Sequence, residues 1–240
     1  MNINKFMRKI NFYAILAVII AFCVQMLTYW GAKLFQNNLV HYNLETAFDK
    51  AFPLIPEFVI IYMGCYFFWI ANYLIIANIS REHCNRFMIG DWLGKILCFV
   101  FFVTLPTTNF RPELAGNDFC SLALQKVWDA DSPYNLLPSA HCFISWMCFI
   151  GLRRQEKISL WYKIFSCFIA ILIFISVMAT KQHVALDIFS AVILAEFCYW
   201  ISGKIYNGLL KKVVEKFADI KNCSTFALAI TKQWLRSSTE

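Results

Sequence analysis

The sequence has few charged residues and few of the residues that mark loops. Only 15% of its 240 residues are charged, against about 25% in an ordinary soluble domain. It contains only 8 glycines and 6 prolines, and it shows no internal repeat, low-complexity segment or Gly/Ser linker. These shortages exclude a disordered chain, a collagen and a coiled coil. Hydrophobic residues (60%) and aromatic residues (18%) are abundant. This composition predicts a protein that crosses a membrane several times.

The ten cysteines lack the spacing of a disulfide framework or of a metal site. No C-x-x-C pair occurs, and most of the cysteines lie inside apolar runs, as Cys65, Cys98 and Cys148 do. Cysteine in such surroundings behaves as a small hydrophobic side chain. We therefore expect buried, unpaired cysteines.

Six apolar runs are long enough, or nearly so, to cross a bilayer, which takes about 20 helical residues. They cover residues 10–32, 58–78, 89–106, 136–152, 160–179 and 184–203. Together they take about half of the chain and leave no room for a separate soluble domain. We predict an all-α fold, a polytopic membrane bundle of six transmembrane helices that forms a single domain over residues 1–240.

Lysine and arginine are divided unevenly between the two sets of connections. Seventeen of them lie in the N-terminus, the second and fourth connections and the tail, and five lie in the other connections. Because positive loops stay in the cytoplasm, we predict that both termini are cytoplasmic. The net charge of +7 then indicates contact with anionic lipid, and no nucleic-acid partner is expected. Within residues 207–236 the tail has the pattern of a cationic amphipathic helix on the inner leaflet; a solvated tail is an equal alternative.

Polar residues gather in three clusters at the ends of apolar runs. By the count of spans, all three clusters face the same side, which the charge distribution makes the extracytoplasmic side. Polar groups at membrane depth are expensive and mark functional sites. The clusters are Asn109-Phe110-Arg111-Pro112-Glu113, Pro138-Ser139-Ala140-His141, and Thr180-Lys181-Gln182-His183 with Asp187.

The composition of these clusters favours phosphate binding. The fourth and sixth predicted helices begin on the outer side, and a helix N-terminus attracts anions. Ser139 adds a hydroxyl group next to Pro138, which suits a first helical turn. Arg111 offers a planar fork for phosphate oxygens and Lys181 a point charge.

The two histidines of the clusters suit acid–base or nucleophilic chemistry, because imidazole titrates near neutral pH. His183 and Asp187 are four residues apart and share one face of a helix. A carboxylate there can hold the Nδ1–H and leave Nε2 free to attack. With His141 at the start of the fourth run, the three clusters contain the parts of a phosphoryl-transfer site.

In these motifs the chain resembles the PAP2 (type 2 phosphatidic acid phosphatase) superfamily of membrane proteins. That superfamily carries K-x6-R-P, then P-S-x-H, then S-R-x5-H-x3-D. The matching residues, within residues 90–205, are Arg111-Pro112, Pro138-Ser139-Ala140-His141, and Ser176 with His183 and Asp187. The resemblance implies a PAP2-like catalytic core over that range.

The chain departs from the common pattern at three positions. Thr104 stands where the first lysine belongs, Val177 where the arginine after serine belongs, and Ala140 replaces a common glycine. These departures resemble the branch of inositol phosphorylceramide synthase-like proteins, in which a T-K-Q-H-x3-D pattern is familiar. In that branch Lys181 would supply the missing positive charge.

The resemblance implies an enzyme that works through a phosphohistidine and needs no cofactor or metal. His183 would attack phosphorus, Asp187 would orient it, and His141 would protonate the leaving oxygen, while Arg111, Lys181 and Ser139 would hold phosphoryl oxygens. The expected substrate is a phospholipid or polyprenyl phosphate. We expect a lipid phosphate phosphatase in a bacterial inner (plasma) membrane, with its active site extracytoplasmic.

Three other functions stay open. A lipid phosphotransferase would use the same site and pass the phospho-headgroup to an alcohol acceptor. A transporter or channel is a remoter alternative, because no paired halves or interrupted spans are visible. A metal-dependent hydrolase would use His141, His183, Asp187 and Glu113 as ligands. Simpler roles also exist for single residues, such as a headgroup anchor for Arg111 or Lys181 and a helix cap for Ser139.

Overall fold

The computed structural model describes residues 11–36, 39–114 and 116–210, and this part of the chain is mainly helical. The predicted amphipathic tail at residues 207–236 lies almost entirely outside the described residues. The elements in chain order are α2 (Phe12–Gln36), β1 (Tyr42–Asn43), α3 (Ala47–Ala51), the 3-10 helix η1 (Pro56–Phe58), α4 (Val59–Ile79), α5 (Arg81–Thr104), β2 (Thr107–Thr108), α6 (Phe119–Ala130), α7 (Ala140–Arg153), α8 (Leu160–Ala179), α9 (Ala185–Ile205) and the π-helix η2 (Tyr206–Leu210).

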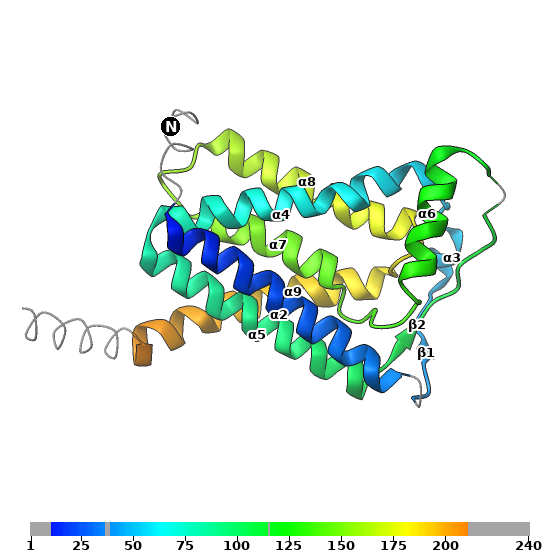
Figure 1. Cartoon of the computed structure of the whole chain (residues 1–240), viewed down its shortest axis with the longest axis horizontal. Coiled ribbons are helices and arrows are strands. Elements are labelled where there is room, and N and C mark those ends of the chain that lie inside the picture. Colours follow the sequence, from blue (N-terminus) through cyan, green and yellow to red (C-terminus); the bar gives the residue numbers. More distant parts are fainter. Residues whose placement is uncertain (1–10, 37–38, 115, 211–240) are drawn as a thin grey trace, which may run out of the picture.

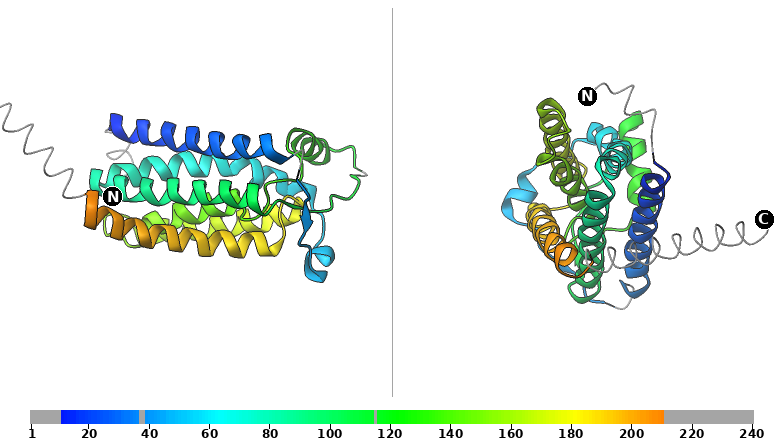
Figure 2. Two further views of the ribbon diagram at one scale, coloured as in Figure 1. Left: turned by 90° about the horizontal axis from the view of Figure 1, so that it is seen from below. Right: turned by 90° about the vertical axis from the view of Figure 1, so that its left-hand side faces the viewer.

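The long helices run side by side in one bundle (Figures 1 and 2). The start of α2 and the end of α9 lie at one end of this bundle, and α3, α6, β1 and β2 gather at the other. At the first end, Asn11 N donates to Asn78 Oδ1 at the end of α4 (3.1 Å). We call the opposite end, which carries the short elements, the loop end.

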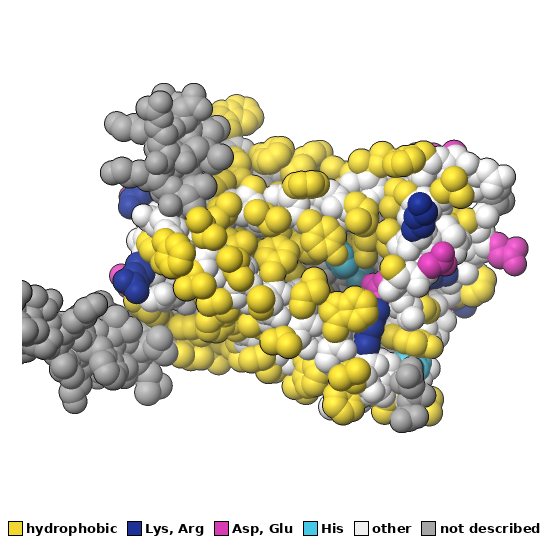
Figure 3. Space-filling model, in the orientation of Figure 1, with side chains coloured by type: hydrophobic (Ala, Val, Ile, Leu, Met, Phe, Trp, Pro, Cys, Tyr) yellow, Lys and Arg dark blue, Asp and Glu magenta, His cyan; other side chains and the backbone are white. Residues whose placement is uncertain are grey.

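Within the described residues, five helices are long and apolar enough to cross a membrane: α2, α4 with η1, α5, α8, and α9 with part of η2. Figure 3 shows apolar side chains covering the flank of the bundle. This architecture is that of a membrane-embedded helical protein, as the composition predicted.

The fourth predicted span, residues 136–152, differs from the expectation. The structure forms only the 14-residue helix α7 there, which at 1.5 Å per residue is shorter than a bilayer core of about 30 Å. Residues 131–139 approach it as a non-helical segment, and Ser139 caps its first turn by accepting from Cys142 N. Most of α7 is buried among the other helices, so its apolar run reflects a position inside the bundle.

Small residues allow the helices to approach closely, as expected where lipid removes the hydrophobic drive for association. The three alanines Ala14, Ala21 and Ala32 of α2 are fully buried. A side chain at Gly94 of α5 would overlap the ring of Phe143 in α7. The nine cysteines of the described residues are unpaired, and most of them are buried, as predicted.

Two ion pairs involve residues of the long helices, one within α5 and one between α7 and α9. Lys95 Nζ lies 2.7 Å from Asp91 Oδ2, both side chains being almost fully buried. Lys95 is one of the seventeen cations assigned above to connections, in its case the second connection. That placement is wrong, because α5 begins at Arg81 and carries Lys95 into the core. Nearer the other end, Arg153 donates to both carboxylate oxygens of Glu196, at 2.6 and 2.7 Å, and so ties α7 to α9.

Candidate active site

At the loop end, His183 is held by the carboxylate of Asp187. The Nδ1 atom lies 3.2 Å from Asp187 Oδ2, and both residues are buried. The same Oδ2 accepts from Val184 N at 3.0 Å, which fixes the carboxylate at the first turn of α9. With Nδ1–H donating to this carboxylate, Nε2 is the ring nitrogen that carries a free lone pair. This is the arrangement that the four-residue spacing predicted.

His141, in the first turn of α7, faces His183. The ring centroids lie 6.0 Å apart, close enough for both imidazoles to contact one phosphoryl group. His141 is surrounded by aromatic rings: Tyr62 stacks on it at 4.6 Å, and Trp69 lies at 5.4 Å. Its Nε2 is buried without a hydrogen-bond partner among the described residues. A buried polar atom of this kind costs free energy unless a ligand or water satisfies it.

A cavity of about 270 Å³ opens beside His141. Figure 3 shows histidine, acidic and basic side chains at a hollow in the otherwise apolar flank. Through this cavity a ligand can reach His141 from the apolar flank of the bundle. Its walls come from α2, α4, α6 and α7 and include Tyr29, Trp30, Tyr62, Tyr66, Trp69, Asp131 and His141.

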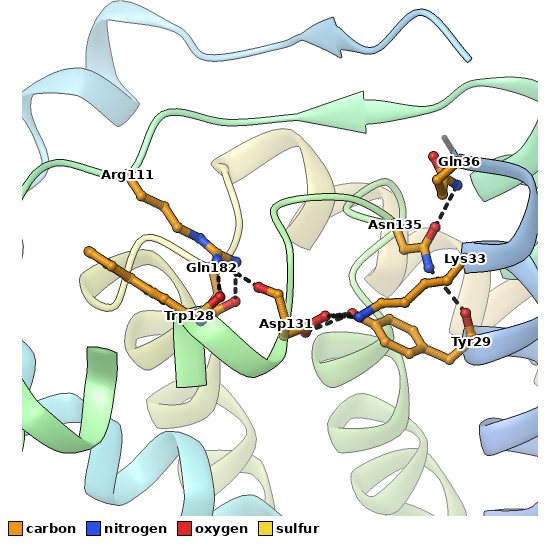
Figure 4. Close-up of polar contacts among 8 residues, drawn as sticks. All are labelled: Tyr29, Lys33, Gln36, Arg111, Trp128, Asp131, Asn135 and Gln182. Atoms are coloured by element: carbon orange, nitrogen blue, oxygen red, sulfur yellow. Dashed lines mark hydrogen bonds and ion pairs between the residues drawn. The ribbon is translucent and has the colours of Figure 1, made fainter. Parts of the chain in front are cut away.

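Arg111 lies between the end of α6 and the segment before α9 (Figure 4). One terminal nitrogen donates to Asp131 O at 2.6 Å, and the other donates to Gln182 Oε1 at 2.9 Å. Its guanidinium carbon lies 5.7 Å from the ring centroid of Trp128, and its Nε is buried without a partner among the described residues. Burial lowers the pKa of Arg111 from its usual value, and the negative charge of Asp131 offsets part of that change. The guanidinium stays charged.

The segment that carries His183 is held by contacts from several other segments at the loop end. Ile55 N donates to Ala179 O at 2.9 Å, Trp128 Nε1 to Thr180 O at 3.0 Å, and Asn109 Nδ2 to Lys181 O at 2.9 Å. These segments are far apart in the sequence, and they meet in the structure. The polar clusters around Asn109 and His183 are therefore brought together, as the sequence analysis expected.

Lys181 is not directed at the histidines. Its ammonium donates to Asp49 O at 2.9 Å and to Phe52 O at 2.6 Å, so it anchors the segment between α2 and α4. Its backbone is left-handed, with φ of 52°, at the turn that ends α8, where glycine is usual. The sequence pattern predicts that this ammonium contacts phosphate; in the structure it contacts two backbone carbonyls instead.

Asp49 occupies the N-terminus of α9, where the sequence analysis expected phosphate. Its Oδ1 accepts from Ala185 N at 2.7 Å, and its Oδ2 accepts from Thr46 N and Oγ1. Burial raises the pKa of Asp49, but these hydrogen bonds outweigh burial and leave the pKa lowered. Together with the bond from Val184 N to Asp187, they use the first free N–H groups of α9. An anion at this helix end would have to displace a carboxylate.

Ser139 is fully buried at the start of α7. Its hydroxyl caps the helix, and its backbone N donates to Asp187 O at 3.1 Å, which joins the P-S-A-H segment to the start of α9. The helix-cap role is therefore the one that its observed contacts support. Its predicted phosphate contact stays a prediction.

At two positions of the common motif, Thr104 and Val177, the chain lacks the expected cation. Thr104 is exposed at the end of α5, and its hydroxyl donates to Val100 O of the same helix. Val177 is fully buried in α8. An arginine at the fully buried Val177 would require a different local packing.

Several residues of the site were missed by sequence reasoning. Asp131, Tyr29 and Lys33 form a hydrogen-bonded cluster at the cavity (Figure 4). Gln182 and Trp128 both contact the guanidinium of Arg111. Gln182 lies within the third polar cluster, but no role was assigned to it. The sequence signal for Tyr29, Lys33, Trp128 and Asp131 was weak, because α2, α6 and the residue after α6 carry no motif. Among the described residues, no group of three or more His, Cys, Asp or Glu side chains is placed to hold a metal ion.

No model of a known protein family matches the chain, and a search of curated proteins finds no match. The assignment of a function therefore depends on the motifs and on the geometry of the site.

Proposed function

We propose that the protein is a lipid phosphate phosphatase of the PAP2 type, with six membrane-crossing segments, cytoplasmic termini and an extracytoplasmic active site. The observation that carries the proposal is the pair of histidines at the loop end. His183 is oriented by Asp187, and His141 presents an Nε2 atom that has no hydrogen-bond partner among the described residues, beside a cavity in the apolar flank. The order and spacing of the three motifs support it.

The reaction has two steps. In the first, Nε2 of His183 bonds to phosphorus while the P–O bond to the lipid alcohol breaks, and the leaving oxygen takes a proton from His141. In the second, water attacks phosphorus, the P–N bond breaks and His141 regains a proton from that water. Arg111 lies next to Gln182 and stabilises the charge that develops on the phosphoryl oxygens. Asp187 keeps the imidazole of His183 in the attacking tautomer.

The substrate is a lipid that carries its phosphate at the membrane surface. The aromatic and aliphatic walls of the cavity favour a hydrocarbon neighbour to the phosphate, as in a phospholipid or a polyprenyl phosphate. An alcohol acceptor in place of water would make the same site a phosphotransferase, of the inositol phosphorylceramide synthase-like type. A bacterial inner membrane is the proposed location.

The test is turnover of a panel of phosphatidic acid, lysophosphatidic acid and polyprenyl diphosphate by the purified protein. Phosphate release and new lipids would be measured together, with and without an alcohol acceptor. We expect His183→Ala and His141→Ala each to lower turnover by about 10³-fold or more, because each removes a group of the covalent step. Labelled phosphate should be trapped on residue 183 of the wild type.

His41→Ala is the matched control, because His41 lies at the same end and contacts Gln36 (2.8 Å), outside the histidine pair. It should keep its activity. Wild-type turnover in either active-site variant contradicts the mechanism. Activity that is lost with EDTA and restored by zinc favours the metal-dependent alternative.

A further inference from the structure

The proposed function leaves a shortage of positive charge at the site. A phosphate monoester carries between about −1.5 and −2 charges at neutral pH. The ammonium of Lys181 is held by two backbone carbonyls, and the N-terminus of α9 is occupied by Asp49 and Asp187. Of the two cations that the sequence pattern offered, only Arg111 remains near the histidines. A second cation is needed in a partly dehydrated site.

Lys33 lies in the right place. Its Nζ is 2.7 Å from Asp131 Oδ1 and 4.4 Å from the ring centroid of Trp30. Asp131 and Trp30 line the same cavity as His141. Asp131 also accepts from Arg111 through its backbone oxygen, so that Lys33, Arg111 and the cavity meet around one residue (Figure 4).

The ion pair between Lys33 and Asp131 can open, so that Lys33 exchanges the carboxylate for a phosphate. The two side chains are 18% and 21% exposed, and ion pairs that water reaches contribute little to stability. Tyr29 OH lies 2.7 Å from both carboxylate oxygens, so Asp131 keeps a hydrogen-bond donor when the lysine leaves. A phosphate dianion attracts an ammonium more strongly than a carboxylate does, and the flexible lysine stem allows the movement.

We propose that Lys33 is the second phosphate-binding cation of the site. In the free protein it pairs with Asp131; with substrate bound, it contacts the phosphoryl oxygens in the cavity beside His141. This assignment rests on the proposed function and adds to it a residue from α2, outside the three motifs. The ligand chemistry is a phosphoryl group, from a lipid phosphate or from free phosphate.

The test uses the full chain in detergent, with two measurements. One is inhibition by orthophosphate, and the other is kcat and KM for a short-chain phosphatidic acid. Lys33→Met should weaken both orthophosphate inhibition and substrate binding by about 10- to 100-fold, the range for a lost hydrogen bond to a charged group. Lys33→Arg should keep part of the binding. Lys126→Met, at an exposed position of α6, is the control and should match the wild type.

Asp131→Asn separates the proposal from a structural role of the ion pair. If Lys33 binds phosphate, the amide frees the lysine, and orthophosphate should bind more tightly; adding Lys33→Met should remove that gain. If the pair only holds α2 in place, Asp131→Asn and Lys33→Met should weaken binding to the same extent, which overturns the proposal. Unchanged orthophosphate inhibition in Lys33→Met overturns it as well.

A failure of the proposed function would give a different experimental result from a failure of the Lys33 assignment. In that case the wild type turns over no lipid phosphate and equals His183→Ala. An active wild type with an unaffected Lys33→Met variant rejects the assignment of Lys33 alone. Melting temperatures of all variants show whether each one is folded.

Discussion

At the scale of single residues, Lys181 shows how one side chain can match a motif and still serve another purpose. The T-K-Q-H pattern predicts a phosphate contact, yet the ammonium of Lys181 lies against the carbonyls of Asp49 and Phe52. It sits two residues before His183, in the left-handed turn that leads to it. The geometry makes Lys181 a positioning residue for His183, the proposed nucleophile.

Lys181→Met tests this reading. The variant keeps the aliphatic stem and removes the anchor, so we expect kcat to fall by about 10- to 100-fold, the scale of a displaced reacting group. KM and inhibition by orthophosphate should stay unchanged, because no phosphate contact is lost. Lys50→Met, an exposed neighbour in α3, is the control. Weaker inhibition of Lys181→Met by orthophosphate would contradict the positioning role and support the phosphate contact that the sequence pattern predicts.

At the scale of elements, α5 is fixed in the bundle by charged groups in its middle. Asp91 and Lys95 form a buried pair, Lys95 also donates to Ala21 O of α2 at 2.9 Å, and the hydroxyl of Tyr73 in α4 donates to Asp91. Three helices are thus joined at one point. All of these polar groups are satisfied, so the cluster is a structural connection.

The contribution of this cluster to the free energy of unfolding can be measured in detergent. Lys95→Met leaves a buried carboxylate without its counter-ion and should cost about 3–5 kcal/mol. Replacing both charges, as Asp91→Asn with Lys95→Met, should recover a large part of that loss, because no uncompensated charge remains. Thermal unfolding of both variants gives the comparison. A double variant as unstable as the single one would show that the hydrogen bonds, and not the charges, matter most.

At the scale of the whole molecule, the loop end and the opposite end should face different sides of the membrane. Single cysteines at two exposed positions can test this: Asn117→Cys at the loop end and Glu156→Cys between α7 and α8. In a background without the native cysteines, an impermeant reagent added outside should label position 117 in intact cells. Position 156 should react only after permeabilisation. The reverse pattern would place the site in the cytoplasm.

The sequence by itself determined the class of architecture and the outline of the site. Long apolar runs can only be helices in a membrane, because every backbone polar group must be satisfied within its own segment. The pairing of His183 with Asp187 also followed from sequence, since side chains four residues apart share a helix face.

The tertiary structure decided the rest. Four features depend on contacts between residues far apart in the chain. They are the short α7, the anchoring of Lys181, the occupation of the α9 N-terminus by Asp49, and the pairing of Lys33 with Asp131. Only packing fixes such contacts. A long cation can reach several acceptors from the same position, so its sequence number does not tell which acceptor it meets. The contacts of Lys33, Lys181 and Asp49 around the proposed phosphate site therefore came from the fold, whereas its histidines and Arg111 were predicted from the sequence.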